Sequence, residues 1–222
     1  MKIHELEIFT SKLKQQTTFY TQTLGLSIVE QTSSSASFQI GNSKLKLVQK
    51  ENSTPYHYAI NIPANQEKEA LEWLKQKVEI LKDEELEIQH FDFWDAYAVY
   101  FYDEDKNIIE LIARKTLKNE SDQPFSEKSL LEISEIGVPT LDIEQEYQHL
   151  NTTSGIPIYS GSTERFCAIG DEHGLFIIIN TSLKKEWFPT EDKPFFSSFK
   201  IKFAEGNKEF KFAYTEGKIR AV

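Results

Sequence analysis

Hydrophobic and polar residues alternate along much of this chain, a pattern that predicts many short β-strands. The first such stretch covers residues 3–9 and leads to Ser11, where a helix is predicted to begin. Leu13 and the pair Phe19-Tyr20 form the apolar face of that helix, and Gly25 marks its end. Three further strands are predicted, at residues 27–31, 36–40 and 44–48.

The same order of elements then starts again. A strand that contains His57 is closed by Pro63, and an amphipathic helix is predicted from about residue 66 to residue 81. Strands are predicted after it at residues 87–91, 96–102 and 107–113. Two strand-helix-three-strand units with a period near 53 residues indicate an internal repeat.

A polar stretch without hydrophobic pattern, residues 115–128, is interpreted as a linker. It divides the chain into a domain of residues 1–114 and a second, degenerate domain of residues 129–222. The second domain begins with a third unit, and three final strands lack a helix. Its predicted elements are a strand at 130–138, a helix near 142–150, and strands at 157–159, 165–169, 175–180, 198–203, 209–214 and 218–222.

Composition narrows the classes of partner. A formal charge of −10 argues against nucleic acids and against anionic membranes, because both partners attract lysine and arginine. Cys167 is the only cysteine, so neither an intrachain disulfide nor a cysteine-based zinc cluster is expected. The sequence shows no signal core and no apolar run of about 20 residues. We therefore expect a cytoplasmic protein that acts on a small molecule.

Three polar residues recur at matching places in the repeat. Glu5, His57 and Glu110 each lie among apolar residues of a predicted strand, at intervals of 52 and 53 residues. All three side chains are able to bind a metal ion, which suggests repeated units that share one cavity. Any one of them alone is better explained by solvent exposure or a hydrogen bond, and it is the set of three that favours a metal ion. His4 replaces Glu5 as the candidate ligand if the strand register is shifted by one residue.

The repeat and its motifs resemble the vicinal oxygen chelate superfamily, also called the glyoxalase/bleomycin resistance protein/dioxygenase fold. Phe19-Tyr20 with Leu24-Gly25-Leu26 resembles the end of the helix in one module of that family. Residues 99–111 resemble its strand, turn and final glutamate-bearing strand, although Glu104 and Lys106 replace the usual proline and glycine of the turn. The resemblance covers residues 1–114 well and weakens beyond them.

The resemblance implies an α+β fold in which tandem βαβββ modules curl mixed β-sheets around a concave cavity, with a second related domain behind it. It also implies a divalent metal ion held by Glu5, His57 and Glu110. A set of one imidazole and two carboxylates accepts zinc, nickel, manganese or iron(II).

Strand alternation extends the candidate site. Glu7 and Phe9 are predicted on the face of Glu5, and Asn61 on the face of His57. Glu7 and Glu110 are the candidate catalytic carboxylates, with a hydrogen-bonding role equally open for Glu7. Candidate substrate-binding residues are Phe9, Asn61, Phe93 and Trp94, the last two in the aromatic segment 90–94, where core packing is the competing explanation. His90 is either an acid–base group or a surface residue.

The leading hypothesis is a metal-dependent enzyme that chelates two adjacent oxygens of a small substrate, as glyoxalase-like isomerases, lyases and ring-cleaving dioxygenases do. Proton transfer is favoured over oxygen activation, because iron oxygenases usually bind metal through two histidines and one carboxylate. The alternative is a metal-free protein of the bleomycin-resistance type, for which an acidic chain suits a cationic ligand. The C-terminal domain is assigned a structural, lid or oligomerisation role, which leaves a homodimer open.

Overall fold

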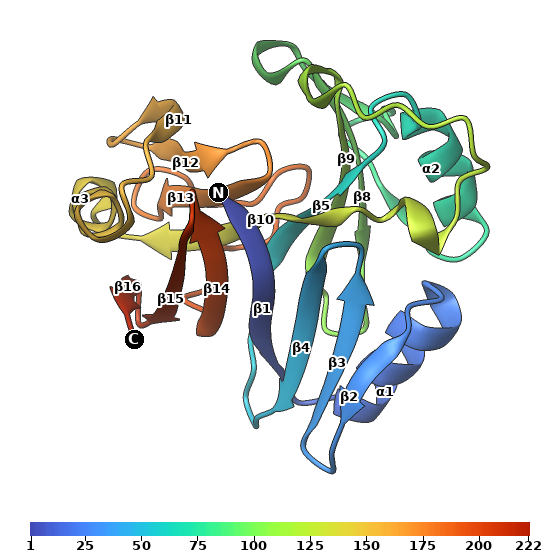
Figure 1. Cartoon of the computed structure of the whole chain (residues 1–222), viewed down its shortest axis with the longest axis horizontal. Helices are drawn as coiled ribbons and strands as arrows, with labels where there is room; N and C mark the ends of the chain where they lie inside the picture. The colour runs from blue at the N-terminus through green and yellow to red at the C-terminus, as the bar shows by residue number, and fades with distance from the viewer.

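Two curved β-sheets carry most of the regular structure in the computed structural model, which describes all 222 residues (Figure 1). The first sheet, sheet A, has the strand order β16-β15-β14-β1-β4-β3-β2. Its strands are β1 (Lys2–Thr10), β2 (Ile28–Gln31), β3 (Ser35–Ile40), β4 (Ser43–Gln49), β14 (Phe199–Glu205), β15 (Lys208–Thr215) and β16 (Lys218–Ala221).

The second sheet, sheet B, has the order β11-β12-β13-β10-β5-β9-β8-β6, and β7 also pairs with β8. Its strands are β5 (His57–Ile62), β6 (Ile80–Leu81), β7 (Gln89–Phe91), β8 (Ala96–Tyr102), β9 (Ile108–Arg114), β10 (Glu132–Thr140), β11 (Ile158–Ser162), β12 (Phe166–Asp171) and β13 (Gly174–Asn180). Both sheets are mixed, as the repeated units predict.

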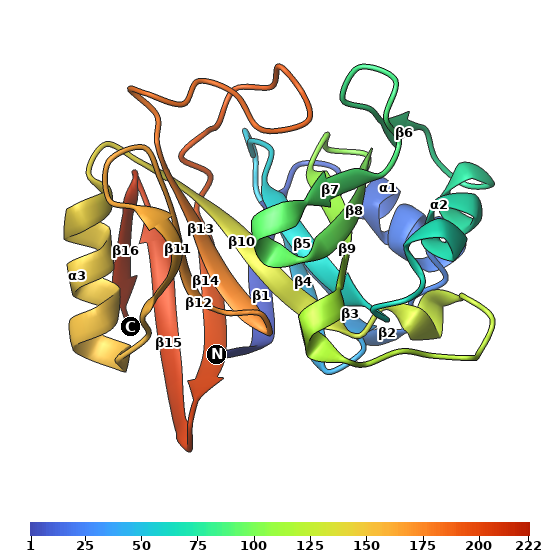
Figure 2. The same cartoon turned by 90° about the horizontal axis from the view of Figure 1, so that it is seen from above.

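Three α-helices flank the sheets, with α3 at one end of the molecule and α1 and α2 at the other (Figure 2). They are α1 (Leu13–Thr18), which continues as the π-helical turn η1 (Phe19–Thr23), α2 (Glu67–Lys75) and α3 (Ile143–Ser154). Single 3₁₀ turns lie at η2 (Asp92–Trp94), η3 (Lys115–Leu117) and η4 (Glu127–Ser129). No helix has the length and apolar character needed to cross a membrane.

The predicted second helix is shorter than its hydrophobic period indicated. It ends at Lys75 instead of residue 81, and the chain then forms strand β6, in which Ile80 pairs with Phe101 of β8. Val78 packs against the core from the turn between them. The apolar positions of this segment therefore do face the interior. Those after Lys75, however, belong to a turn and to strand β6 and not to the helix.

The units pair in an order that the sequence did not indicate. In the second unit β9 lies parallel to β5, and the free side of β5 pairs antiparallel with β10, the first strand of the third unit. In the same way β1 of the first unit pairs with β14 near the end of the chain. The predicted boundary at residues 115–128 therefore does not separate the sheets: the first unit joins the last strands, and the second joins the third.

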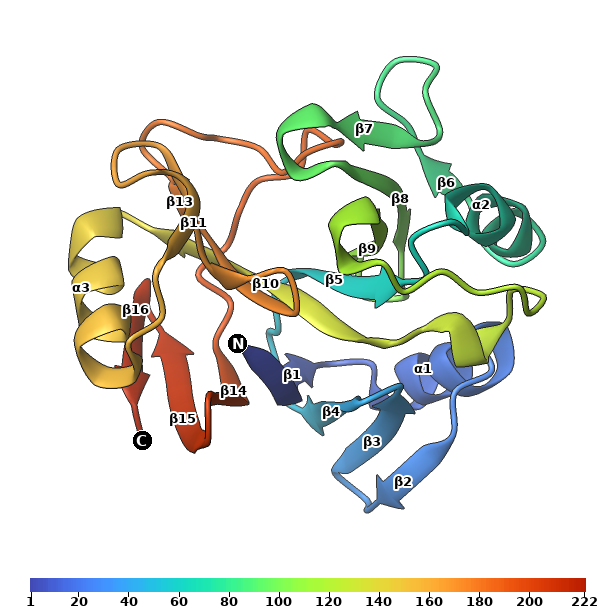
Figure 3. The ribbon, with the colours of Figure 1, turned by 45° about the horizontal axis from the view of Figure 1, so that its top comes forward.

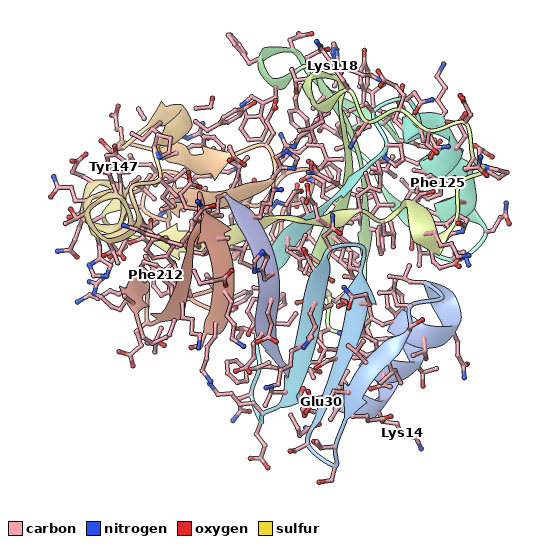
Figure 4. The ribbon with its side chains drawn as sticks, viewed as in Figure 1. Lys14, Glu30, Lys118, Phe125, Tyr147 and Phe212 are labelled. Carbon is pink, nitrogen blue, oxygen red and sulfur yellow. The ribbon has the colours of Figure 1, made fainter.

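One large hydrophobic core of 43 buried residues lies between and behind the two sheets. Phe125, in the segment between β9 and β10, extends it beside α2, where its ring packs 5.5 Å from that of Trp73 (Figure 4). Ser43 at the start of β4 fastens the sheets together: its hydroxyl donates to the Ile3 carbonyl at 2.6 Å and accepts from the Ile133 amide at 2.9 Å. A second cluster of 11 buried residues is separate from this core, and three of them, Tyr100, Ile177 and Trp187, line a cavity of sheet B.

Candidate functional site

A cavity of about 550 Å³ lies in sheet B between the second and third units. The segment that joins β13 to β14 (orange) runs across to β7 and the turn after it (green), and both contribute to the walls (Figure 3). The cavity is lined by His57, His90, Phe91, Asp92, Phe93, Trp94, Tyr100, Glu110, Glu135, Ser160, Arg165, Phe166, Ile177, Lys184, Trp187 and Phe188.

Three buried side chains with metal-binding atoms meet in this cavity. One ligand atom each from His57, Glu110 and Glu135 lies within 4.8 Å of the other two. The Nε2 atom of His57 is 3.6 Å from Oε2 of Glu110. One imidazole nitrogen and two carboxylates form a donor set that suits a divalent cation and leaves coordination positions for other molecules.

The pairing of β5 with β10 explains why these residues meet. The two strands run antiparallel at the centre of the sheet, with Ala59 opposite Glu135, and each has the last strand of its own unit parallel beside it. His57 and Glu135 therefore occupy equivalent first-strand positions. Glu110 projects from β9, where it pairs with Ala59. By the same symmetry, the counterpart of Glu110 on β13 is Ile177, which pairs with Gly137.

The neighbours of His57 favour a neutral imidazole whose Nε2 faces the carboxylates. Its Nδ1 lies 3.3 Å from the Ile108 carbonyl, so that Nδ1–H donates and Nε2 keeps its lone pair. Burial lowers the pKa of His57 to about 4, and the ring of Trp187 packs against it at 5.1 Å. A neutral, oriented imidazole is the form that binds metal ions.

The two carboxylates have different surroundings. Burial, followed by the charge of Glu135, raises the pKa of Glu110 well above its usual value, while Arg114 and Tyr100 oppose the rise. Burial also raises the pKa of Glu135, against the effect of Arg114, whose Nη2 donates directly to it. Arg114 is fully buried and its Nε donates to Asn61 at 3.2 Å. Arg114 pairs with Glu135 alone, so the ionised form of Glu110 lacks a cationic partner in this buried site, a role that a divalent cation would fill.

The predicted ligand Glu5 does not join this group, and this part of the sequence interpretation is corrected. Glu5 lies on sheet A, where its carboxylate is 2.6 Å from Lys202 and 3.6 Å from Lys44. These lysines stand directly beside it on β14 and β4. Because β1 pairs with β14 and not with β5, Glu5 is separated from the cavity of sheet B.

Glu7 and His4 also lie outside the cavity. Glu7 is 2.9 Å from both Lys46 and Lys200, which makes it part of a ladder of ion pairs across sheet A. The lysines outweigh the effect of burial and lower the pKa of Glu7. His4 contacts Glu209 at 3.1 Å. Neither residue is placed to act on a molecule bound at His57.

The predicted substrate-binding residues divide between the two sheets. Phe93 and Trp94 line the cavity, with Phe93 fully exposed at its mouth. Asn61 lies behind the cavity, where it supports Arg114 and donates to Glu132 at 3.1 Å. Phe9 lies on sheet A beneath the ammonium group of Lys50. His90 lines the cavity at the surface, stacked on Tyr97 at 4.3 Å.

Glu135, Arg114 and Trp187 are site residues that the sequence interpretation did not assign. Glu135 lies in the strand predicted at residues 130–138, in the domain that was assigned a structural, lid or oligomerisation role, and no ligand was proposed there. An acidic residue at the first-strand position of a third repeat was the available signal. Trp187 lies in an irregular segment between β13 and β14, and no periodicity could place it.

Comparison with known proteins identifies the fold of this site. A family model described as the Glyoxalase/Bleomycin resistance protein/Dioxygenase superfamily matches residues 2–111. Comparison with curated proteins gave no match.

Two solved structures resemble most of the chain. A Bacillus subtilis protein with a provisional assignment as a dioxygenase has a TM-score of 0.61 and 14% identity, over 82% of this chain and 64% of its own. Glyoxalase I from Zea mays has a TM-score of 0.54 and 14% identity, over 80% of this chain and 66% of its own. At this identity the likeness concerns the fold, and this chain spans less than two thirds of either protein.

Proposed function

The chain belongs to the Glyoxalase/Bleomycin resistance protein/Dioxygenase superfamily, and on that basis we propose that it is a metal-dependent enzyme of the vicinal oxygen chelate type. The observation that carries the proposal is the convergence of His57, Glu110 and Glu135 inside a cavity. These residues would hold one divalent ion. When bound, the ion would polarise two adjacent oxygens of a small substrate and stabilise the negative charge that develops on them.

The chain's own residues supply binding and proton transfer. Phe91, Trp94 and Phe188 give the cavity apolar walls that hold the carbon skeleton of a substrate and limit access of water. The carboxylates that line the cavity are Asp92 at its exposed rim, Glu110 and Glu135. Because Glu135 is tied to Arg114, we assign Glu110 as the group that accepts a substrate proton at its carboxylate oxygen.

A second candidate function has its own observation. In the Arg114–Glu135 ion pair, one of the three candidate metal ligands already has a cationic partner. A metal-free protein that sequesters a small molecule between aromatic walls is consistent with this arrangement. The two functions differ in whether the purified protein contains metal.

Elemental analysis and calorimetric titration with zinc, nickel, manganese and iron(II) test the proposal. We expect one ion per chain in the unaltered protein, and loss of that ion in His57→Ala, Glu110→Gln and Glu135→Gln. Glu5→Gln is the matched control, since it removes a carboxylate that lies on the other sheet. Absence of metal from the unaltered protein, or equal loss of metal in Glu5→Gln, contradicts the proposal.

A further inference from the structure

Two cationic side chains stand on the rim of the cavity. Arg165 and Lys184 both line the 550 Å³ cavity, and both also line a second hollow of about 400 Å³ that opens outside it. They are therefore located where the two spaces meet. A molecule bound at the cavity floor and extending outward passes them.

Backbone hydrogen bonds fix these residues relative to each other. The amide of Asn180 donates to the Arg165 carbonyl at 3.1 Å, and the Lys184 amide donates to the Asn180 carbonyl at 2.8 Å. Asn180 is the last residue of β13. Both cations are thus positioned by the end of one buried strand.

Neither cation has a carboxylate within ion-pair distance, although the chain contains more acidic than basic residues. Lys184 is only partly exposed. Its burial, followed by the charge of Arg165, lowers the pKa of Lys184, and Glu186 opposes this effect. Two like charges held close together without a partner are stabilised by a bound anion.

Other charged residues of the cavity have partners of opposite sign. Glu135 is paired with Arg114, and Asp92 lies 3.1 Å from His90. The outer hollow carries four acidic residues against its four basic ones, so it has no excess charge of its own. Its charged residues are Lys82, Asp83, Glu84, Arg165, Lys184, Lys185, Glu186 and Glu191.

We propose that the substrate carries an anionic group, a carboxylate or a phosphoryl or phosphonyl group, which Arg165 and Lys184 bind at the rim. The proposal rests on the proposed function only for the oxygens at the other end of the molecule, beside His57. The substrate is then an elongated molecule with chelating oxygens at the floor, an apolar middle and an anionic end. This differs from the metal-free alternative, for which the acidic chain suits a cationic ligand.

Calorimetry on chelator-treated, metal-free protein tests the anion site without the metal site. The probes are benzoate and phenylphosphonate, with benzamide as the neutral analogue of similar shape. Fluorescence of Trp94 and Trp187, which line the cavity, gives an independent readout of where they bind. The variants are Arg165→Gln and Lys184→Gln, and the control is Lys185→Gln, which removes the neighbouring lysine that lines only the outer hollow.

We expect the anions to bind more tightly than benzamide, and each rim variant to weaken anion binding by about ten- to a hundredfold while leaving benzamide unchanged. The relative affinities of benzoate and phenylphosphonate separate a carboxylate from a phosphoryl-type group. Equal binding of anions and benzamide, or equal losses in Lys185→Gln and the rim variants, overturns the proposal. Anion binding in a protein that takes up no metal sustains the anion site and refutes only the metal-dependent function.

Discussion

Arg114 connects the candidate site to its supporting residues. It is completely buried, donates to Glu135 and Asn61, and lies 5.3 Å from the centre of the Trp94 ring. Its remaining terminal nitrogen, Nη1, has no hydrogen-bond partner. Burying a guanidinium group is costly, and the carboxylate of Glu135 compensates for part of that cost. Burial of Arg114 therefore depends on Glu135, and burial of an ionised Glu135 depends on Arg114.

Replacing Arg114 by methionine should destabilise the protein by about 3–5 kcal/mol, because it leaves the buried Glu135 without a cation. Urea unfolding monitored by circular dichroism measures this loss. The double variant Arg114→Met/Glu135→Gln should recover a large part of it, since the uncompensated charge is then absent. A loss below about 1 kcal/mol in the single variant would show that the pair contributes little to folding.

At the residue level the sequence predicted two of the three buried side chains whose metal-binding atoms meet in the cavity. His57 and Glu110 were identified because polar residues among apolar ones are conspicuous in a strand. Glu5 satisfied the same criterion but is explained by Lys44 and Lys202 on neighbouring strands. Those partners come from distant parts of the chain, and no local pattern shows that they flank Glu5.

At the level of elements, the parallel and antiparallel pairings set which positions face the cavity. The second and third units present equivalent strands, yet the equivalence of their side chains is incomplete. Glu110 on β9 has Ile177 as its counterpart on β13, and Ile177 also lines the cavity. The third unit thus contributes one candidate metal ligand, Glu135, whereas the second unit contributes two, His57 and Glu110.

Replacing Ile177 by glutamate should provide a third carboxylate, and so a fourth ligand, at the proposed metal site. We expect metal affinity to increase by about tenfold or more, because another anionic oxygen joins the donor set. Without metal the same variant should be less stable than the unaltered protein, since it buries an unpaired charge. Calorimetric metal titration and thermal unfolding with and without zinc measure both effects. Ile177→Gln is the matched control, and an equal affinity in the two variants would contradict the predicted symmetry.

The elements themselves were largely predictable. Alternation located nearly every strand and the order of the units, because a strand with one buried face repeats every two residues. The pairing between units was not predictable, since every first strand offers a similar free edge. The family resemblance was strongest in residues 1–114, and this favoured a cavity there instead of between the second and third units.

At the level of the whole molecule, the two sheets form one unit of stability. They share the core of 43 residues, and Ser43 bonds to β1 and to β10 at once. Gly41 in the neighbouring turn has a φ of +50°, and a Cβ atom there would lie 1.8 Å from the Leu131 carbonyl oxygen. The contact between this hairpin and the segment before β10 therefore leaves no room for a side chain.

Ser43→Ala should lower stability by about 1–3 kcal/mol, because the Ile133 amide and the Ile3 carbonyl both lose their partner. Far-ultraviolet circular dichroism and tryptophan fluorescence should report the same single transition, since sheet A does not unfold separately. Ser134→Ala is the matched control: Ser134 is also buried, but its hydroxyl has no partner. Two separated transitions, or equal effects of both variants, would contradict a shared core fastened at Ser43.

The pairing of β1 with β14 affects how the protein is made. Glu7 on β1 and Lys200 on β14 are separated by 193 positions along the chain. A ribosome therefore delivers the first strand long before its neighbour on one side exists, whereas strands β5 to β13 are available together. During synthesis the nascent chain exposes an unpaired edge of β1, of the kind that chaperones protect and that promotes aggregation. All the strands of sheet B, which contains the cavity, are synthesised before sheet A receives its last three strands.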